Sequence, residues 1–209
     1  MSKISAVLFD FDGVLIDSLP VMKIAWKSVQ ENYKIKANFE QFKMHIGIPF
    51  ESILTKMEVN RKYHKSIKEH YSFVSTENIN LVKLNPFVRF LLIWLKENSI
   101  SIGIVTSKDQ LRTNQLIDLF QLNVKSVVTP ELTKKGKPFP DPILLAAKDL
   151  SVELNNIVFI GDMLSDMQCA LKAKCYYLHY LNGYQKIYHQ SYGGSINSLK
   201  EIIEYINHF

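Results

Sequence analysis

Short apolar runs alternate along the chain with longer segments in which apolar residues recur every three or four positions. The short runs lie at residues 4–9, 100–105, 124–128, 157–160 and 176–179. Apolar runs of this length predict buried strands. Helical spacing predicts helices at residues 86–97, 109–120, 143–150, 165–172 and 195–207. Strands and helices therefore alternate from residue 86 onward, which favours a parallel sheet covered by helices.

A helical insertion follows the first predicted strand directly. Residues 18–84 contain helix-like pieces and no strand pattern, and Pro20 suits the first turn of a helix. Asn85-Pro86 marks the boundary at which the alternation begins. We therefore expect a Rossmann-like α/β core made of residues 1–17 and 85–209, with a small helical cap domain made of residues 18–84.

Polar residues stand where several of the predicted strands end. Asp10 and Asp12 follow the first strand, and Thr106 and Asp162 follow two later ones. Ligands of parallel α/β sheets bind at the carboxyl ends of the strands. We therefore expect these four side chains to converge on one edge of the sheet.

The pair Asp10 and Asp12 has two interpretations when it is considered alone. Two carboxylates this close repel each other unless a cation or a shared proton compensates. Gly13 permits a sharp turn and the close approach of another group to the backbone. The alternative is a strand that ends in an ordinary Asp-Gly turn.

Composition excludes several classes of protein. The chain has 209 residues, of which 47% are hydrophobic and 22% charged, as is typical of soluble globular proteins. A net charge of +5 could attract anionic metabolites but does not indicate nucleic acid. Two cysteines form no disulfide framework, and neither a signal peptide nor a membrane-length apolar run is present. We therefore expect a cytoplasmic protein with no nucleic-acid or membrane partner, and the sequence indicates no oligomeric state.

Four motifs in order resemble the haloacid dehalogenase-like hydrolase superfamily. They are Asp10-Phe11-Asp12-Gly13-Val14-Leu15, Thr106 after Ile102-Gly103-Ile104-Val105, Lys137 in Gly136-Lys137-Pro138-Phe139-Pro140-Asp141-Pro142, and Gly161-Asp162-Met163-Leu164-Ser165-Asp166. Each motif alone is weak or moderate, but the ordered set is specific and covers nearly the whole chain. The helical insertion after the first strand resembles the branch of phosphoglycolate phosphatases and β-phosphoglucomutases.

The resemblance implies a magnesium-dependent phosphatase that acts on a small phosphorylated metabolite. Asp10 would attack phosphorus and form an aspartyl-phosphate. Asp12 would protonate the leaving oxygen and later take a proton from the attacking water. Thr106 would donate its hydroxyl to a phosphoryl oxygen, and Lys137 would supply positive charge. The backbone amide of Ser107 would help to complete the phosphate cradle.

The same resemblance implies which residues hold the metal and which contact the substrate. Mg²⁺ would be bound by Asp10, the backbone carbonyl of Asp12, and Asp162. Asp166 would support the metal through water or a contact to its ligands, although capping of a helix N-terminus is the alternative. His45 lies where the cap of related enzymes often faces the substrate, and the alternative is a histidine on a surface loop.

Other functions remain open at this stage. β-Phosphoglucomutases carry a histidine at the position of Met22, and methionine cannot shuttle a proton, so mutase activity is disfavoured. A non-catalytic protein that binds phosphorylated metabolites on the same fold is a further alternative. Phosphoglycolate, a sugar phosphate, a nucleotide and pyrophosphate are all candidate substrates.

Two further patterns are assigned to ordinary packing. The basic segment 61–68 carries one apolar side, so we expect a solvated helix face rather than a nucleic-acid site. Trp26 and Trp94 fall on apolar helical stripes, and we expect both of them in the core.

Overall fold

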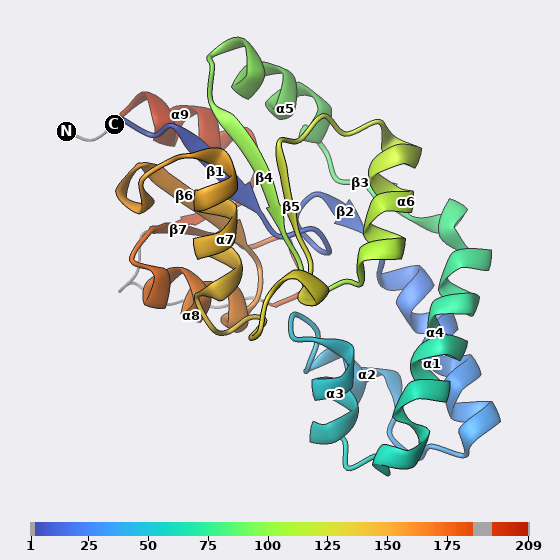
Figure 1. Ribbon diagram of the computed structural model, residues 1–209. Helices are drawn as coiled ribbons and strands as arrows, with labels where there is room; N and C mark the ends of the chain where they lie inside the picture. The colour runs from blue at the N-terminus through green and yellow to red at the C-terminus, as the bar shows by residue number, and fades with distance from the viewer. Residues whose placement is uncertain (1–2, 186–193, 209) are drawn as a thin grey trace.

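A six-stranded parallel sheet forms the centre of the computed structural model, which describes residues 3–185 and 194–208 (Figure 1). Its strand order is β5-β4-β1-β6-β7-β8, and every neighbouring pair is parallel. The strands are β1 Ala6–Phe9, β4 Ser101–Val105, β5 Ser126–Val128, β6 Ile157–Gly161, β7 Tyr176–Tyr180 and β8 Ser195–Ile196. The expected Rossmann-like α/β fold is thus confirmed.

Helices cover both faces of the sheet. Successive side chains of a strand point to opposite faces, and apolar residues on both faces pack against these helices. Val7 and Phe9 of β1 join an apolar cluster with residues of α5 and α9, whereas Ala6 and Leu8 join a second cluster with residues of α7 and α8. Leu116 of α6 adds to the first cluster. These helices are α5 Val88–Glu97, α6 Gln110–Phe120, α7 Asp141–Leu150, α8 Leu164–Ala173 and α9 Glu201–Asn207.

The segment between β2 Ile16–Asp17 and β3 Lys83–Leu84 contains four α-helices with an apolar core of their own. They are α1 Leu19–Tyr33, α2 Phe39–Lys43, α3 Phe50–Lys56 and α4 His64–Glu77. Trp26 is fully buried there, stacks on Phe42 with ring centroids 4.6 Å apart, and donates its indole N–H to the Ala37 carbonyl at 3.0 Å. Figure 1 shows this helical insertion beside the carboxyl ends of β1 and β4. The division into domains at residues 17 and 84 stays a prediction.

Both ends of the insertion meet in a small antiparallel sheet. β2 Ile16–Asp17 pairs with β3 Lys83–Leu84. The Asn85 side-chain amide also donates to the carbonyls of Gly13 at 3.1 Å and Val14 at 2.9 Å. The absence of a strand from residues 18–84 was therefore a wrong expectation. Strands of two residues are too short to leave a periodic pattern in a sequence.

The expected closing helix at residues 195–207 was wrong in its first part. Ser195 and Ile196 pair with His179 and Tyr180 as the edge strand β8, and α9 begins only at Glu201. The partner residues in β7 lie outside the segment 195–207, so the spacing of apolar residues within that segment could not indicate the pairing. Short 3₁₀ helices complete the described elements at Arg61–Tyr63, Ile79–Leu81, Pro130–Leu132 and Leu154–Asn156.

The two remaining expectations on packing had different outcomes. The basic segment 61–68 exposes Arg61, Lys62 and Lys65 and buries Ile67, as expected of a solvated helix face. Trp94 is only half-buried, in contrast to Trp26. In the described part of the chain, no helix has the length and apolar character needed to cross a membrane.

Truncation of the two tryptophans should separate their contributions to stability. We expect Trp26→Ala to lower the free energy of unfolding by about 3–5 kcal/mol, because a fully buried ring leaves a cavity. Trp94→Ala, the matched control, should lower it clearly less because the Trp94 side chain is only partly buried. Urea unfolding curves of both variants provide the measurement. Equal losses would contradict a closed apolar core in the insertion.

Candidate functional site

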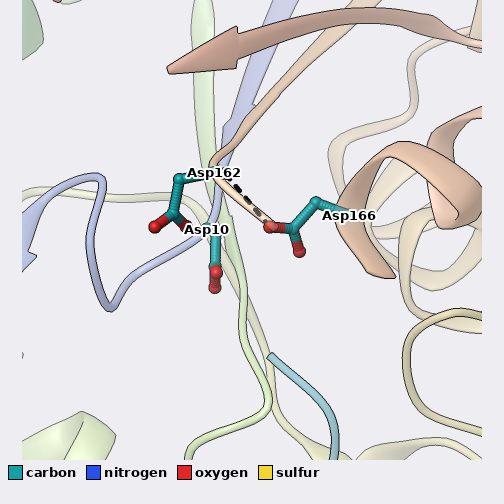
Figure 2. A group of neighbouring side chains, drawn as sticks. All are labelled: Asp10, Asp162 and Asp166. Atoms are coloured by element: carbon teal, nitrogen blue, oxygen red, sulfur yellow. Dashed lines mark hydrogen bonds between the residues drawn. The ribbon is translucent and has the colours of Figure 1, made fainter. Parts of the chain in front are cut away.

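Three buried aspartates gather at the carboxyl ends of the two central strands. Asp10 follows β1 and Asp162 follows β6, and these strands are neighbours. Asp166 comes from the first turn of α8. Oxygen atoms of the three carboxyl groups lie within 4.8 Å of one another (Figure 2). The sequence analysis expected all three side chains at one site, although Asp10 lies far from Asp162 and Asp166 in the sequence.

Lys137 provides positive charge at the centre of this acidic cluster. Its Nζ lies 2.8 Å from Asp10 Oδ1 and 2.7 Å from Asp166 Oδ1, and the side chain is fully buried. Burial lowers the pKa of Lys137, but the two carboxylates outweigh it and hold that pKa above its ordinary value, so the lysine stays charged. The rigid segment with three prolines, residues 136–142, delivers this lysine into the site.

One lysine does not neutralise three carboxyl groups. Burial, followed by the charge of Asp166, raises the pKa of Asp10 to about 7 despite the opposing effect of Lys137. Burial and the charge of Asp10 likewise raise the pKa of Asp162 well above its ordinary value. Such shifts indicate that further positive charge would be bound favourably here.

The donor set fits a hard divalent cation. Among the described residues, the buried Asp162 Oδ1 has no hydrogen-bond partner, whereas its Oδ2 accepts the Tyr184 N–H at 2.5 Å. Mg²⁺ prefers oxygen ligands of this kind. Asp166 Oδ2 accepts the N–H groups of Asp162 at 3.2 Å and Met163 at 2.9 Å. Asp166 therefore satisfies amides at the start of α8 and also faces the cluster, so the two interpretations of this residue are compatible.

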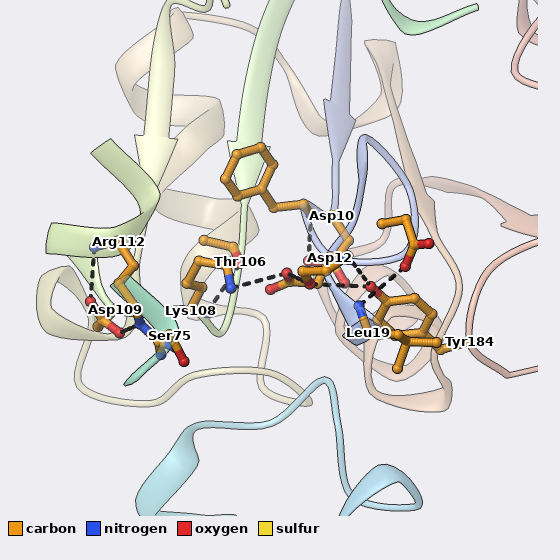
Figure 3. A network of polar contacts seen from close by, with 12 residues as sticks. Asp10, Asp12, Leu19, Ser75, Thr106, Lys108, Asp109, Arg112 and Tyr184 are labelled. Carbon is orange, nitrogen blue, oxygen red and sulfur yellow. Dashed lines mark hydrogen bonds and ion pairs between the residues drawn. The ribbon is translucent and has the colours of Figure 1, made fainter. Parts of the chain in front are cut away.

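Asp12 lies in a second network, which Figure 3 shows. Its Oδ1 is 3.0 Å from Lys108 Nζ and also accepts a hydrogen bond from Ser18 Oγ. Both Lys108 and Ser18 are buried. Burial lowers the pKa of Lys108, although the Asp12 charge opposes this. The sequence analysis did not identify Lys108. Its position in the turn after Thr106, close to the expected site, was the signal that could have indicated it.

Thr106 and Ser107 occupy the turn after β4. The Thr106 hydroxyl oxygen accepts the Lys108 N–H at 3.1 Å, which shapes this turn. The Ser107 hydroxyl donates to the Gly47 carbonyl at 2.9 Å, and the Ser165 hydroxyl donates to the same carbonyl at 2.9 Å. Gly47 has a φ of +96°, and a Cβ there would lie 2.7 Å from Ser165 Oγ. The insertion therefore contacts the core through a backbone position that requires glycine.

A cavity of about 50 Å³ lies between the core and the insertion. Asp10, Asp12, Thr106 and Ser107 line it from the core, and Met22, Phe50 and Tyr71 are among the residues that line it from the insertion. Three of the four strand-end residues, Asp10, Asp12 and Thr106, line this one cavity, whereas Asp162 is not among its lining residues.

His45 is separated from that cavity. It lines a neighbouring groove of about 630 Å³ together with Lys56, Lys134, Lys135 and Lys137. Burial lowers the pKa of His45, and the nearby charge of Lys56 acts in the same direction, so its neutral form is favoured. The structure therefore brings Asp10, Asp12, Thr106, Ser107, Lys137, Asp162 and Asp166 together and leaves His45 at the adjoining groove.

Known proteins resemble the chain in sequence and in fold. A phosphorylated carbohydrates phosphatase of Thermotoga maritima is 28% identical over 177 residues, which cover 80% of this chain and 81% of the relative. A β-phosphoglucomutase of Bacillus subtilis is 30% identical over 174 residues, which cover 75% of this chain and 74% of the relative. A crystal structure of a hydrolase from Pseudomonas syringae superposes with a TM-score of 0.86 at 20% identity and covers 98% of this chain and 99% of its own.

Most of the chain matches the profile of one protein family. Residues 7–179 match the profile of the haloacid dehalogenase-like hydrolases. This span begins within β1, ends within β7 and includes all four strand-end and loop motifs. The expected resemblance is confirmed: the chain belongs to the haloacid dehalogenase-like hydrolase family.

Proposed function

We propose that this protein is a magnesium-dependent phosphatase that hydrolyses a small phosphorylated metabolite through an aspartyl-phosphate. The observation that carries the proposal is the environment of Asp10. Its Oδ1 accepts the Phe11 N–H at 2.7 Å and lies 2.8 Å from Lys137 Nζ. Both contacts use the same oxygen, so Oδ2 is the oxygen available as a nucleophile.

The first half of the reaction transfers the phosphoryl group to Asp10. Oδ2 forms a bond to phosphorus while the bond from phosphorus to the leaving oxygen breaks. The charge of Lys137 and the hydroxyl of Thr106 stabilise the phosphoryl oxygens. Asp12 gives its proton to the leaving oxygen, so that the product departs as an alcohol.

The second half returns the enzyme to its starting state. Asp12, now a carboxylate, takes a proton from a water molecule that attacks the phosphorus of the aspartyl-phosphate. The bond between phosphorus and Asp10 breaks, and inorganic phosphate leaves. Lys108, whose Nζ lies 3.0 Å from Asp12 Oδ1, remains beside this carboxyl group between the two halves.

A magnesium site completes the proposal. Asp10, Asp162, Asp166 and the backbone carbonyl of Asp12 are the groups that would hold Mg²⁺. Bound Mg²⁺ would supply the positive charge that offsets repulsion between these carboxylates and the phosphate. Asp162 Oδ1 has no hydrogen-bond partner among the residues that the structure describes, and this observation supports the assignment together with the mutual approach of the three carboxyl groups.

The dimensions of the cavity support a small substrate. The narrow cavity of about 50 Å³ beside Asp10 and Thr106 suits the phosphoryl group, and the groove of about 630 Å³ that Lys137 also lines lies next to it. The substrate class that we propose is a phosphoglycolate-like or small sugar-phosphate-like ester. A role for His45 in binding the substrate stays a prediction, as do the cytoplasmic location and the absence of nucleic-acid and membrane partners.

Mutase activity is the second candidate, because the Bacillus subtilis relative is named a β-phosphoglucomutase. Met22, which stands where the resemblance places a histidine in such mutases, lines the cavity beside Asp10 and Asp12. A thioether carries no exchangeable proton, so this side chain cannot move a proton to or from a sugar hydroxyl. Hydrolysis is accordingly favoured over mutase activity, and the intact set of aspartates favours catalysis over simple binding.

Phosphate release from a panel of phosphorylated metabolites tests the proposal. We expect Mg²⁺-dependent release by the wild type and a loss of at least roughly 1000-fold in Asp10→Asn, because the nucleophile is removed. Asp118→Asn, on the exposed face of α6, is the matched control and should keep its activity. Turnover that survives in Asp10→Asn would show that another group is the nucleophile, and no turnover of any substrate would refute hydrolysis.

The acidic cluster should also make stability depend on pH in the metal-free protein. The pKa of Asp10 rises from 3.8 to about 7 on folding, so its contribution to stability is fully present below 3.8 and is lost as the pH rises through about 7. We expect the free energy of unfolding to fall by a few kcal/mol over this range, and less in Asp10→Asn. Added Mg²⁺ should stabilise the wild type more at about pH 8 than at about pH 5. Urea unfolding at several pH values provides the measurement. If the free energy of unfolding of the wild type did not fall as the pH rises, the charge interactions assigned to the acidic cluster would be wrong.

A further inference from the structure

Tyr184 connects three parts of the molecule that the proposed reaction needs in fixed positions. It lies in the loop after β7, and its N–H donates to Asp162 Oδ2 at 2.5 Å. Its hydroxyl oxygen accepts the Ser18 N–H at 2.9 Å, at the start of α1. Its ring packs against the apolar core of the insertion, in the cluster that contains Met22 and Trp26.

The adjacent Gly183 permits this close approach. A Cβ at Gly183 would overlap the side chain of Asp162. The loop therefore passes directly over one of the proposed metal ligands before it reaches Ser18. Neither Gly183 nor Tyr184 belongs to the four motifs that the sequence indicated.

The donors and acceptors between Tyr184 and Asp12 follow from their chemistry. A carboxylate oxygen only accepts, so in the contact between Ser18 Oγ and Asp12 Oδ1 the serine donates its single proton. Ser18 Oγ must then accept in its 3.2 Å contact with Tyr184 Oη, and the phenol donates. The result is a chain of hydrogen bonds that runs from Tyr184 through Ser18 to Asp12. Donors in such a chain polarise and strengthen one another.

This chain determines which oxygen of Asp12 can react. Ser18 and Lys108 both contact Oδ1, from two different elements. Their contacts fix the rotation of the carboxyl group and leave Oδ2 as the oxygen that can carry the transferred proton. A general acid must hold its proton within hydrogen-bond reach of the leaving oxygen, so this rotation matters for catalysis.

We propose that Tyr184 is a positioning residue, which orients the carboxyl group of Asp12 for proton transfer by way of Ser18. The inference rests on the proposed phosphatase function, because it assigns Asp12 the role of general acid. Since the ring of Tyr184 lies on the insertion, the alignment of Asp12 also depends on the insertion being packed against the core. If Tyr184 only held this loop in place, its removal would instead lower kcat/KM for all substrates by the same factor.

Two substrates with different leaving groups separate these roles. An alkyl phosphate from the panel has a poor leaving group that needs protonation, whereas p-nitrophenyl phosphate has a leaving group that departs without it. We expect Tyr184→Phe to lower kcat/KM for the alkyl phosphate about tenfold and for p-nitrophenyl phosphate less than about twofold. The ratio kcat/KM covers the steps up to departure of the leaving group, so the later hydrolysis of the aspartyl-phosphate does not enter it.

Further variants test the chain itself. Ser18→Ala should show the same selective loss, and the double variant should lose no more than either single variant, because both changes interrupt one chain. Tyr177→Phe is the matched control, because it also removes a buried phenol hydroxyl from the same region of the fold. That hydroxyl contacts His179 Nδ1 at 2.7 Å. The Tyr177→Phe variant should leave the ratio between the two substrates unchanged.

A measurement without turnover checks the geometry. In the metal-free protein, exchange of the Ser18 amide hydrogen, followed by NMR, should be at least about tenfold faster in Tyr184→Phe and unchanged in Tyr177→Phe, because only the former loses its acceptor. Unchanged exchange would refute the contact, and equal losses for both substrates would refute the positioning role. Absence of turnover in the wild type, with Ser18 exchange altered as expected, would instead refute the phosphatase function on which the role depends.

Discussion

The interaction on which the site depends is the burial of Lys137 between Asp10 and Asp166. Three carboxyl groups at the carboxyl ends of β1 and β6 would repel each other strongly in a buried position. Lys137 offsets part of this repulsion, with its Nζ within 2.8 Å of two of the groups. Burial, followed by the remaining excess of negative charge, raises the pKa of Asp10, and a divalent cation would be a favourable partner here. The same electrostatic imbalance therefore supports both the proposed metal site and the proposed role of Asp10.

The helical insertion contacts the core through specific polar groups as well as apolar surface. The Gly47 carbonyl accepts hydrogen bonds from Ser107 and Ser165, which come from the turn after β4 and from α8. On the opposite side, Tyr184 reaches from the loop after β7 to Ser18 at the start of α1. Apolar side chains of the insertion, Met22 and Phe50 among them, line the cavity of about 50 Å³ beside Asp10 and Thr106. The proposed substrate size and the proposed alignment of Asp12 would in this way depend on the same packing.

Much of the fold could be predicted from the sequence, because apolar periodicity reports long elements that are buried on one side or on both. The expectations failed where pairing between distant residues decides the structure. β2 and β3 consist of two residues each, and they exist because the two ends of the insertion meet. β8 forms because Ser195 and Ile196 extend the sheet beside β7, which interrupts the start of the expected closing helix. In each case, local propensity carries no signal of the partner strand.

For the site, the sequence by itself determined the chemistry: carboxylates, a hydroxyl and a lysine placed at strand ends and in a rigid loop, in an order specific to one hydrolase family. Only the tertiary structure decided which of these groups touch. It paired Lys137 with Asp166 as well as Asp10, and it placed Lys108 and Ser18 on Asp12. It also brought Tyr184 onto the chain of hydrogen bonds that ends at Asp12, although 172 positions separate Tyr184 from Asp12 (184 minus 12). The physical reason is that residue types report the reactions that are available, whereas hydrogen-bond partners are set by how the chain folds back on itself.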